Sequence, residues 1–155
     1  HPDISMHWQA VPASDWLGQI ISKNQVESAA VELASENVPD KVGMDPRLME
    51  LALSNLLVNA TRYAKAVVHC SLSQENDGYV LTVEDDGDGI PETERDSVFK
   101  AFTRIDDSRN RETGGYGLGL AVVARVAELH GGEALAESSG ALGGAQFSIR
   151  WPVHG

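Results

Sequence analysis

Two asparagines and an arginine stand at helical spacing in the segment NLLVNATRY, residues 55–63. Asn55 and Asn59 are four residues apart and Arg62 follows three residues later, so on an α-helix the three side chains fall within an arc of about 60°. Asparagine is a poor helix former, and its amide oxygen is a hard ligand of the kind that Mg²⁺ prefers. The segment therefore indicates a possible ligand-binding stripe, although two asparagines taken alone are as easily explained by a solvent-facing stripe.

A second candidate is the segment VEDDGDGIP, residues 83–91, at the expected end of a strand. Gly87 and Gly89 permit backbone conformations that are closed to other residues, and they let a ligand approach the main chain closely. Asp85 can accept a hydrogen bond from an exocyclic amine. An acidic turn that closes a strand is the simpler interpretation of this segment alone, and the spacing does not match a calcium-binding loop.

The third candidate is GGYGLGL, residues 114–120, which opens a predicted helix. Glycine-rich turns that lead into a helix bind phosphates through free N–H groups at the positive end of the helix dipole. The dinucleotide pattern G-x-G-x-x-G is not met, because Leu120 stands where it requires glycine, and no Walker A sequence is present. As an isolated feature the segment is equally typical of a flexible loop.

Alternating helices and strands are expected to position these segments. Asp45 and Pro46 form a strong helix start, an aspartate cap followed by proline at the first helical position. Helices are predicted over 14–30 (capped by Ser14 or Asp15), 45–64, 94–101 and 118–130, and strands over 31–36, 41–44, 66–73, 79–85, 133–138 and 145–151, with a hairpin turn at 75–78 and a loop over 103–116. This order predicts an α+β fold, a two-layer α/β sandwich whose mixed, mostly antiparallel sheet has its helices on one face.

Composition restricts the class of protein further. The chain has 155 residues, of which 42% are hydrophobic and 23% charged, values close to those of a soluble globular domain. The net charge of −11 argues against a nucleic-acid-binding protein, although Lys100, Arg104, Arg109 and Arg111 form a local basic cluster. The sequence contains no membrane-spanning run and no visible secretory signal. The single cysteine requires no oxidising compartment, which fits the cytoplasm.

In this order and spacing, the candidate segments resemble the nucleotide-binding boxes of sensor histidine kinases, in the superfamily shared with gyrase, mismatch-repair ATPases and a heat-shock chaperone. NLLVNATRY resembles the N box, and DDGDGI (85–90) resembles the D-x-G-x-G box. The remaining matches are VFKAFTRID (98–106) to the F box through Phe99 and Phe102, GYGLGLAV (115–122) to the second glycine box, and GGAQFSI (143–149) to the final glycine turn and strand.

The resemblance implies a catalytic ATP-binding domain (HATPase_c or GHKL type) of a bacterial two-component sensor histidine kinase, with the Bergerat-type ATP-binding fold. It covers essentially the whole chain: residues 1–13 form a lead-in, and residues 14–153 form one domain whose nucleotide lid spans about residues 103–116. ATP and Mg²⁺ are the implied cofactors.

Individual roles follow from the same resemblance. Asn59 is similar to the Mg²⁺-ligating asparagine, Asp85 to the aspartate that reads adenine, and Tyr63 to the aromatic residue that packs on the base. The implied catalytic residues are Asn55, Asn59, Arg104 and Arg109, the two arginines being lid residues that can reach the γ-phosphate. The implied nucleotide-binding residues are Asn55, Asn59, Arg62, Tyr63, Asp85, Gly87, Gly89, Ile90, Gly115, Gly117, Leu118 and Gly119.

The resemblance also bears on the reaction. Hydrolytic members of the superfamily usually carry glutamate where Asn55 stands, and an amide cannot take up a proton at neutral pH. This favours phosphoryl transfer over ATP hydrolysis. The family's acceptor histidine is generally followed by an acidic residue, and none of the five histidines here is. The expected partners are therefore a histidine-containing dimerisation domain of the same parent protein and a response regulator.

Two alternatives stay open at this point. One is a freestanding serine kinase that acts as an anti-sigma factor, and the other is a non-catalytic nucleotide-binding regulatory module. The F-box-like segment and the lid disfavour the first, and the intact Asn59 and Asp85 disfavour the second. The parent is expected in the bacterial inner membrane with this domain in the cytoplasm, where the domain itself contacts neither membrane nor nucleic acid.

Overall fold

The computed structural model describes residues 5–34, 37–95, 97–99 and 117–153. Its strands are β1 (Gln9–Pro12), β2 (Ala30–Leu33), β3 (Lys41–Met44), β4 (Val67–Glu75), β5 (Gly78–Asp85), β6 (Glu133–Ser138) and β7 (Ala145–Pro152). Its helices are α1 (Ala13–Lys23), α2 (Pro46–Tyr63) and α4 (Gly117–Leu129), with a 3-10 turn η1 (Glu92–Glu94). None of the described helices combines the length and the apolar composition needed to cross a membrane.

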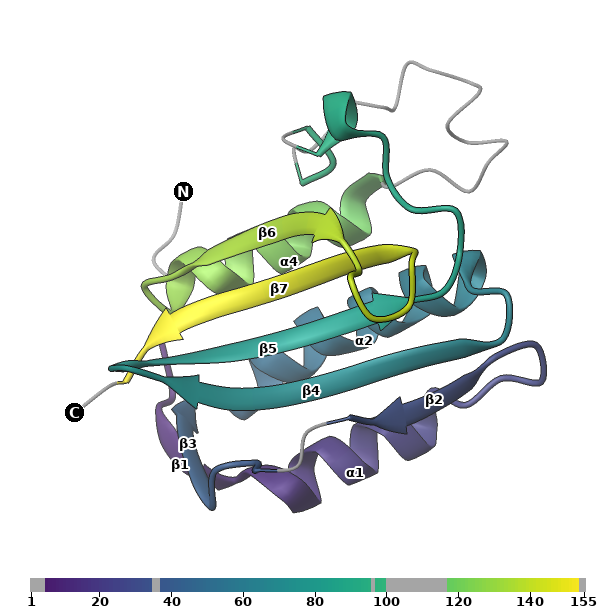
Figure 1. Ribbon diagram of the computed structural model, residues 1–155. Helices are drawn as coiled ribbons and strands as arrows, with labels where there is room; N and C mark the ends of the chain where they lie inside the picture. Colours follow the sequence, from purple (N-terminus) through teal and green to yellow (C-terminus); the bar gives the residue numbers. More distant parts are fainter. Residues whose placement is uncertain (1–4, 35–36, 96, 100–116, 154–155) are drawn as a thin grey trace.

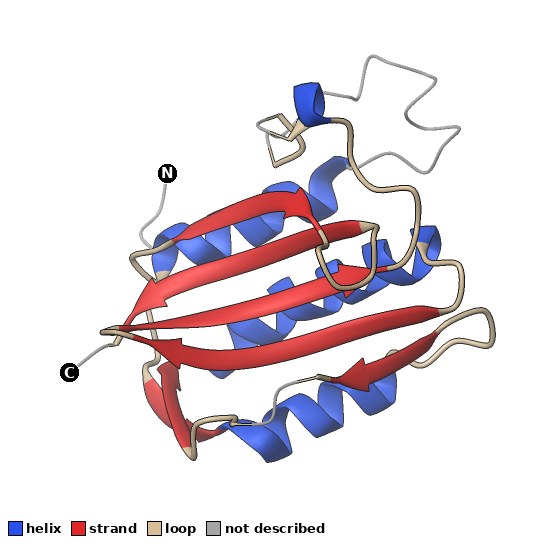
Figure 2. Ribbon diagram, viewed as in Figure 1, coloured by secondary structure: helices blue, strands red, loops and turns tan. Residues whose placement is uncertain are grey.

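A five-stranded sheet in the order β2-β4-β5-β7-β6 forms one layer. Only the edge pair β2 and β4 is parallel, and the other pairs of this sheet are antiparallel. The helices cover one face of the sheet (Figures 1 and 2), and β1 pairs with β3 in a separate two-stranded ribbon. The predicted two-layer sandwich with a mixed, mostly antiparallel sheet is confirmed.

The core lies between the sheet and the helices. Along β4 and β5 every second residue is buried, because successive side chains of a strand point to opposite faces. Leu53, Leu56 and Leu57 of α2 are fully buried against this face. Cys70 on β4 belongs to the same core, and burial raises the pKa of its thiol to about 12.

The start of α2 is formed as predicted. The Oδ1 atom of Asp45 accepts hydrogen bonds from the backbone N–H groups of Arg47 (3.1 Å) and Leu48 (3.3 Å). Pro46 occupies the first helical turn, where its missing N–H leaves no bond unmade. These two residues fix the start of α2. Together with the length of the helix, they therefore determine where the C-terminal end of α2 lies on the sheet.

The predicted helix over residues 14–30 is too long, and neither predicted cap precedes it. The residue before α1 is Pro12, which makes no side-chain capping bond, and α1 ends at Lys23. Asn24 ends the helix because its side-chain Nδ2 donates to the carbonyl of Ile20 (2.8 Å), a local bond that competes with continued helix.

Two features of the strands differ from the sequence-based expectation. β1 was not predicted, and its burial explains why: of its four residues only Val11 is buried, so no alternating pattern marks it. On β2, the alternation of Val31 and Leu33 with Glu32 predicts that both apolar side chains point inward, but Leu33 is 43% exposed, since this strand lies at the edge of the sheet. The predicted helix at 94–101 and the loop at 103–116 lie partly or wholly outside the described residues.

His130 joins the end of α4 to the beginning of α2. Its Nδ1 lies 2.8 Å from the carbonyl oxygen of Val126 and therefore carries a proton, and its Nε2 accepts a hydrogen bond from the backbone N–H of Asp45 (3.1 Å). The rings of Trp8 and Trp151 pack edge-on against it. Burial lowers the pKa of His130 below its ordinary value of 6.5, so the fold holds this ring neutral.

We expect the free energy of unfolding to fall as the pH drops from about 7 to 5. Because the pKa of His130 is lower in the folded protein than its unfolded value of 6.5, the unfolded chain binds the proton first. The stabilisation present above that value is therefore lost on acidification, by up to ~1.4 kcal/mol per pH unit. In urea unfolding over this pH range, the free energy of unfolding should depend less steeply on pH for His130→Gln than for wild type. A wild-type slope in His130→Gln would contradict the assignment.

Candidate functional site

Two of the segments identified in the sequence, NLLVNATRY and VEDDGDGIP, meet at one end of the sheet, where α2 and β5 end and β7 begins (right side of Figure 1). A small pocket lies there, lined by Asn59, Tyr63, Asp85, Gly89, Ile90, Ala145 and Phe147. Its free volume is about 10 Å³, close to what one water molecule needs. An organic ligand is larger than this free volume.

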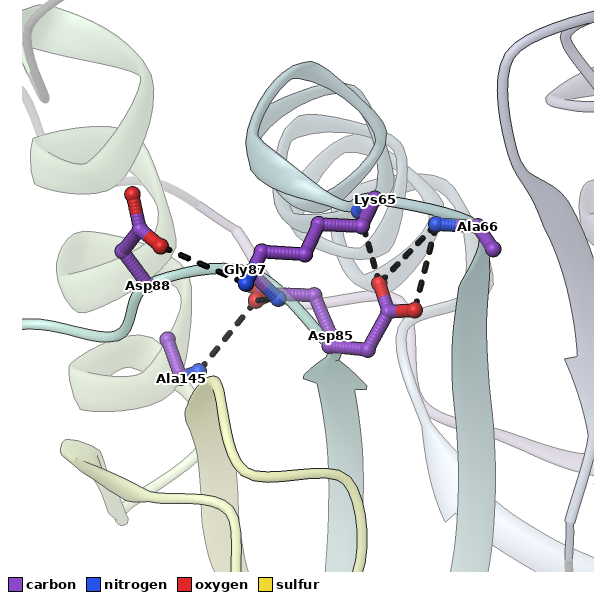
Figure 3. A network of polar contacts seen from close by, with 7 residues as sticks. Lys65, Ala66, Asp85, Gly87, Asp88 and Ala145 are labelled. Carbon is purple, nitrogen blue, oxygen red and sulfur yellow. Dashed lines mark hydrogen bonds and ion pairs between the residues drawn. The ribbon is translucent and has the colours of Figure 1, made fainter.

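Asp85 is the most constrained group of the pocket. The residue is 2% exposed, and its Oδ1 accepts hydrogen bonds from the backbone N–H groups of Gly87 (2.8 Å) and Ala145 (3.2 Å), both visible in Figure 3. Burial raises the pKa of Asp85 above its ordinary value, while the two hydrogen bonds act in the opposite direction. Since both bonds use Oδ1, Oδ2 is available to a donor that enters the pocket.

Asn59 reaches the same pocket from α2. Its side chain is buried, and Nδ2 has no hydrogen-bond partner among the described residues. An unpaired buried amide costs stability, so this group fits a ligand that supplies the missing contact.

The amide oxygen of Asn59 also suits Mg²⁺, which usually keeps several waters and is bound by few protein ligands together with substrate phosphates. Within the described part of the chain, no group of three or more His, Cys, Asp or Glu side chains is arranged to hold a metal ion.

Asn55 lies one turn earlier on α2 and faces α4. Its Nδ2 donates to the carbonyl of Leu51 (2.8 Å). A Cβ atom on Gly119 would stand 2.9 Å from Oδ1 of Asn55, closer than real side chains approach. Glycine at 119 therefore lets α2 and α4 pack closely, and it brings Asn55 to the first turn of α4, which begins at Gly117. The free N–H groups of such a turn attract phosphate.

Two glycines allow the backbone to close around Asp85. A Cβ atom on Gly144 would lie 2.3 Å from both the carbonyl oxygen and Oδ1 of Asp85, and one on Gly87 would lie 2.3 Å from the carbonyl oxygen of Tyr63. Only a residue without a side chain fits at either position. The turn between β6 and β7 can therefore press against the end of β5 and present the N–H of Ala145 to the carboxylate.

The segment that follows the pocket is attached to the sheet at two points. The Nη2 atom of Arg95 donates to Oγ of Ser138 at the end of β6 (2.6 Å). The ring of Phe99 packs edge-on against Phe147, with ring centroids 5.9 Å apart. Phe99, which the sequence singled out in the F-box-like segment, thus contacts a residue that lines the pocket.

The residues implied by the sequence fall into three groups. In the pocket or directly beneath it lie Asn59, Tyr63, Asp85, Gly87, Gly89 and Ile90. At the contact between α2 and the start of α4 lie Asn55, Gly117 and Gly119, and Arg62 is exposed on the last turn of α2. Outside the described residues lie Arg104, Arg109 and Gly115, together with the side chain of Leu118.

Sequence reasoning missed four residues of this region. Ala145 and Phe147 line the pocket, Gly144 packs on Asp85, and Asp86 accepts hydrogen bonds from the connection between α2 and β4. The segment GGAQFSI, residues 143–149, had been singled out as a glycine turn and strand but given no site residue. A pair of glycines directly before a strand was the available signal for Gly144, whereas nothing local marked the other three.

Comparison with known proteins gives one family and several relatives. The model of the histidine kinase-, DNA gyrase B- and HSP90-like ATPase family matches residues 44–155. The sensor protein RstB of Escherichia coli strain K12 is 48% identical over 110 residues, which are 71% of this chain and 25% of that protein. The sensor histidine kinase CpxA of the same strain is 39% identical over 110 residues, 71% of this chain and 24% of that protein. The chain thus spans about a quarter of the length of these relatives.

Among solved structures, the ATP-binding domain of PrrB from Mycobacterium tuberculosis superposes with a TM-score of 0.74 at 29% identity. The match covers 98% of this chain and all of that one. It extends over β1 and α1, which precede the residues matched by the family model.

Gly144→Ala should destabilise the protein by about 1–3 kcal/mol, the usual cost of forcing extra atoms into a packed site. The new methyl group would clash with the backbone and carboxylate of Asp85. Gly140→Ala is the matched control, because it lies in the same turn and a Cβ there meets nothing within 4 Å. Urea unfolding compares the two variants with wild type, and equal stability of both would show that Gly144 does not pack against Asp85 as described.

Proposed function

This chain belongs to the family of histidine kinase-, DNA gyrase B- and HSP90-like ATPases, as an ATP-binding catalytic domain of the sensor histidine kinase kind, and we propose that it transfers the γ-phosphate of ATP to a protein histidine. The proposed acceptor lies on a dimerisation domain of the same parent protein. From there the aspartate of a response regulator receives the phosphoryl group.

The observation that carries the proposal is the hydrogen bonding of the Asp85 carboxylate. Its Oδ1 is held by two backbone N–H groups, and neither of these bonds uses Oδ2. An exocyclic amine such as that of adenine is a donor of the required kind. We propose that Tyr63 and Ile90, which line the same pocket, pack on the faces of the base, and that Gly87 and Gly89 keep the main chain close to it.

We propose that the phosphates lie toward the first turn of α4. The N–H groups of Gly117 and Gly119 are placed at a helix N-terminus, which favours negative charge. Arg62, on the last turn of α2, is the proposed basic residue near the phosphates. The remaining proposed phosphate contacts are Gly115, Leu118 and the lid arginines Arg104 and Arg109, which would stabilise the charge on the transferring group.

Mg²⁺ bound together with the nucleotide would neutralise phosphate charge and help align the γ-phosphate for attack. Asn59 is the proposed protein ligand, through its amide oxygen. Its buried position on α2, beside the pocket that contains Asp85, supports this assignment.

Asn55 supports transfer rather than hydrolysis. Its side chain is a neutral amide whose Nδ2 is already bonded to the carbonyl of Leu51, and an amide cannot remove a proton from an attacking water at neutral pH. We propose that Asn55 keeps the start of α4 in place while offering no general base. The γ-phosphate then persists until an acceptor is presented.

The comparisons favour neither of the alternatives, the anti-sigma-factor serine kinase or the non-catalytic regulatory module. The resemblance to sensor proteins supports two further proposals. The parent protein lies in the bacterial inner membrane, and this domain works in the cytoplasm.

The chain alone should bind Mg²⁺-ATP without phosphorylating itself. Titration calorimetry measures the binding, and γ-labelled ATP measures the transfer. We expect acid-labile label only after the dimerisation domain of the parent is added, and none when its acceptor histidine is replaced by glutamine. No heat of binding at millimolar nucleotide, or stable label on this chain by itself, would refute the proposed function.

Asp85→Asn should weaken adenine recognition selectively. Asparagine can keep its oxygen on the N–H groups of Gly87 and Ala145, but its NH₂ group then replaces Oδ2 and opposes the amine of the base with a second donor. A charge-assisted hydrogen bond is worth about 1.5–3 kcal/mol, so ADP affinity should fall by roughly 10- to 150-fold. GDP affinity should change much less. Unchanged preference for ADP over GDP in a folded variant would reject this role for Asp85.

A further inference from the structure

Asp86 makes contacts that the roles discussed so far do not use. It follows Asp85 directly, but its carboxylate turns away from the pocket toward the connection between α2 and β4. Oδ1 accepts hydrogen bonds from the backbone N–H groups of Lys65 (2.7 Å) and Ala66 (3.1 Å), and Oδ2 lies 3.1 Å from the same Ala66 nitrogen. Figure 3 shows Lys65 and Ala66 beside the end of the strand that carries Asp85.

These bonds join two walls of the pocket. Tyr63, which lines one wall, is the last residue of α2 and lies two residues before Lys65. Asp85, on the other wall, is the last residue of β5 and the neighbour of Asp86. The carboxylate therefore ties the end of α2 to the end of β5 across a separation of 21 residues in sequence.

Gly87 sets a lower limit to the distance between the end of α2 and the end of β5. Because a Cβ there would lie 2.3 Å from the carbonyl oxygen of Tyr63, the two backbones are already as close as glycine allows. Asp86 prevents the two walls from separating, and the contact at Gly87 prevents them from coming closer. The backbone distance between Tyr63 and Asp85 is thus limited from both sides.

The ionised form of Asp86 is the one that makes these hydrogen bonds strong. Burial works to raise its pKa, but the hydrogen bonds from Ala66 and Lys65 outweigh it, so the pKa of Asp86 lies below the ordinary value. The carboxylate is accordingly ionised at neutral pH, and hydrogen bonds to an ionised acceptor are stronger than neutral ones.

We propose that Asp86 is a positioning residue that sets the width of the base-binding pocket by holding the end of α2 against the end of β5. The proposal rests on the proposed function, since it takes this pocket to be the adenine site. Asp86 touches no ligand in this scheme. It acts through Tyr63 and Asp85, and it contributes to selectivity because a base is read correctly only when both walls keep their spacing.

Three variants test the proposal. Asp86→Ala removes the acceptor, whereas Asp86→Asn retains an oxygen that can replace Oδ1 on both N–H groups. Asp88→Ala is the matched control, because it removes an equal charge from the same turn. The side chain of Asp88 is 96% exposed and pairs with the exposed ammonium group of Lys65 (3.5 Å), an arrangement that contributes little.

The dissociation constants of ADP and GDP are measured for each variant, together with hydrogen exchange of the Lys65 and Ala66 amides. We expect Asp86→Ala to weaken ADP binding by about tenfold or more, the equivalent of one charge-assisted hydrogen bond, to reduce the preference for ADP over GDP, and to lose protection of both amides. Asp86→Asn should restore affinity to within about threefold, and Asp88→Ala should resemble wild type.

Other results distinguish failure of the positioning role from failure of the proposed function. Equal ADP affinity and selectivity in Asp86→Ala and Asp88→Ala would overturn the positioning role. The role would also be overturned if Asp86→Asn failed to restore ADP affinity although the amides of Lys65 and Ala66 remained protected. If wild-type protein binds no nucleotide, the proposed function fails and this proposal falls with it, whereas nucleotide binding that is insensitive to Asp86→Ala rejects this proposal alone.

Discussion

A carboxylate buried at the end of a strand has to be hydrogen-bonded, and this constraint organises the site end of the molecule. Asp85 is 2% exposed, and leaving such a group without donors would cost several kcal/mol. One donor, the N–H of Gly87, is local. The other, the N–H of Ala145, is 60 residues away in sequence, so the carboxylate is satisfied only when β7 lies beside β5 in the observed register. The buried charge and the central strand order are therefore linked.

Close backbone approach is the second consequence of this constraint. The turn before β7 can reach Asp85 only because residue 144 has no side chain, and the missing side chain at residue 119 leaves room for the Asn55 amide beside α4. At the opposite end of the helices, His130 ties the end of α4 to the cap of α2. The two helices are thus held together by a buried polar contact at one end and approach each other closely through a glycine at the other.

Local chemistry explains which parts of the structure were predictable. The Asp45-Pro46 pair fixes the start of α2, and alternation marks β4 and β5, because these signals depend on neighbours in sequence. The end of α1 and the strand β1 were missed, since a side chain folding back on Ile20 and a strand with one buried residue leave no periodic trace. In the site, Asp85 and its glycines could be identified by their spacing. Phe147 and Asp86 could not be identified in this way. The role of Phe147 depends on the register of β7, and the role of Asp86 depends on where the chain returns from α2 to β4.

The position of Cys70 has a practical consequence. It is the only cysteine of the chain, it is fully buried on β4, and its raised pKa leaves almost no thiolate at neutral pH. Thiol reagents therefore have no reactive partner in the native protein, and a cysteine engineered at an exposed position would carry a fluorophore or spin label without background. Modification of Cys70 itself would instead report the rate at which the core opens, since the sulfur is fully buried in the folded protein.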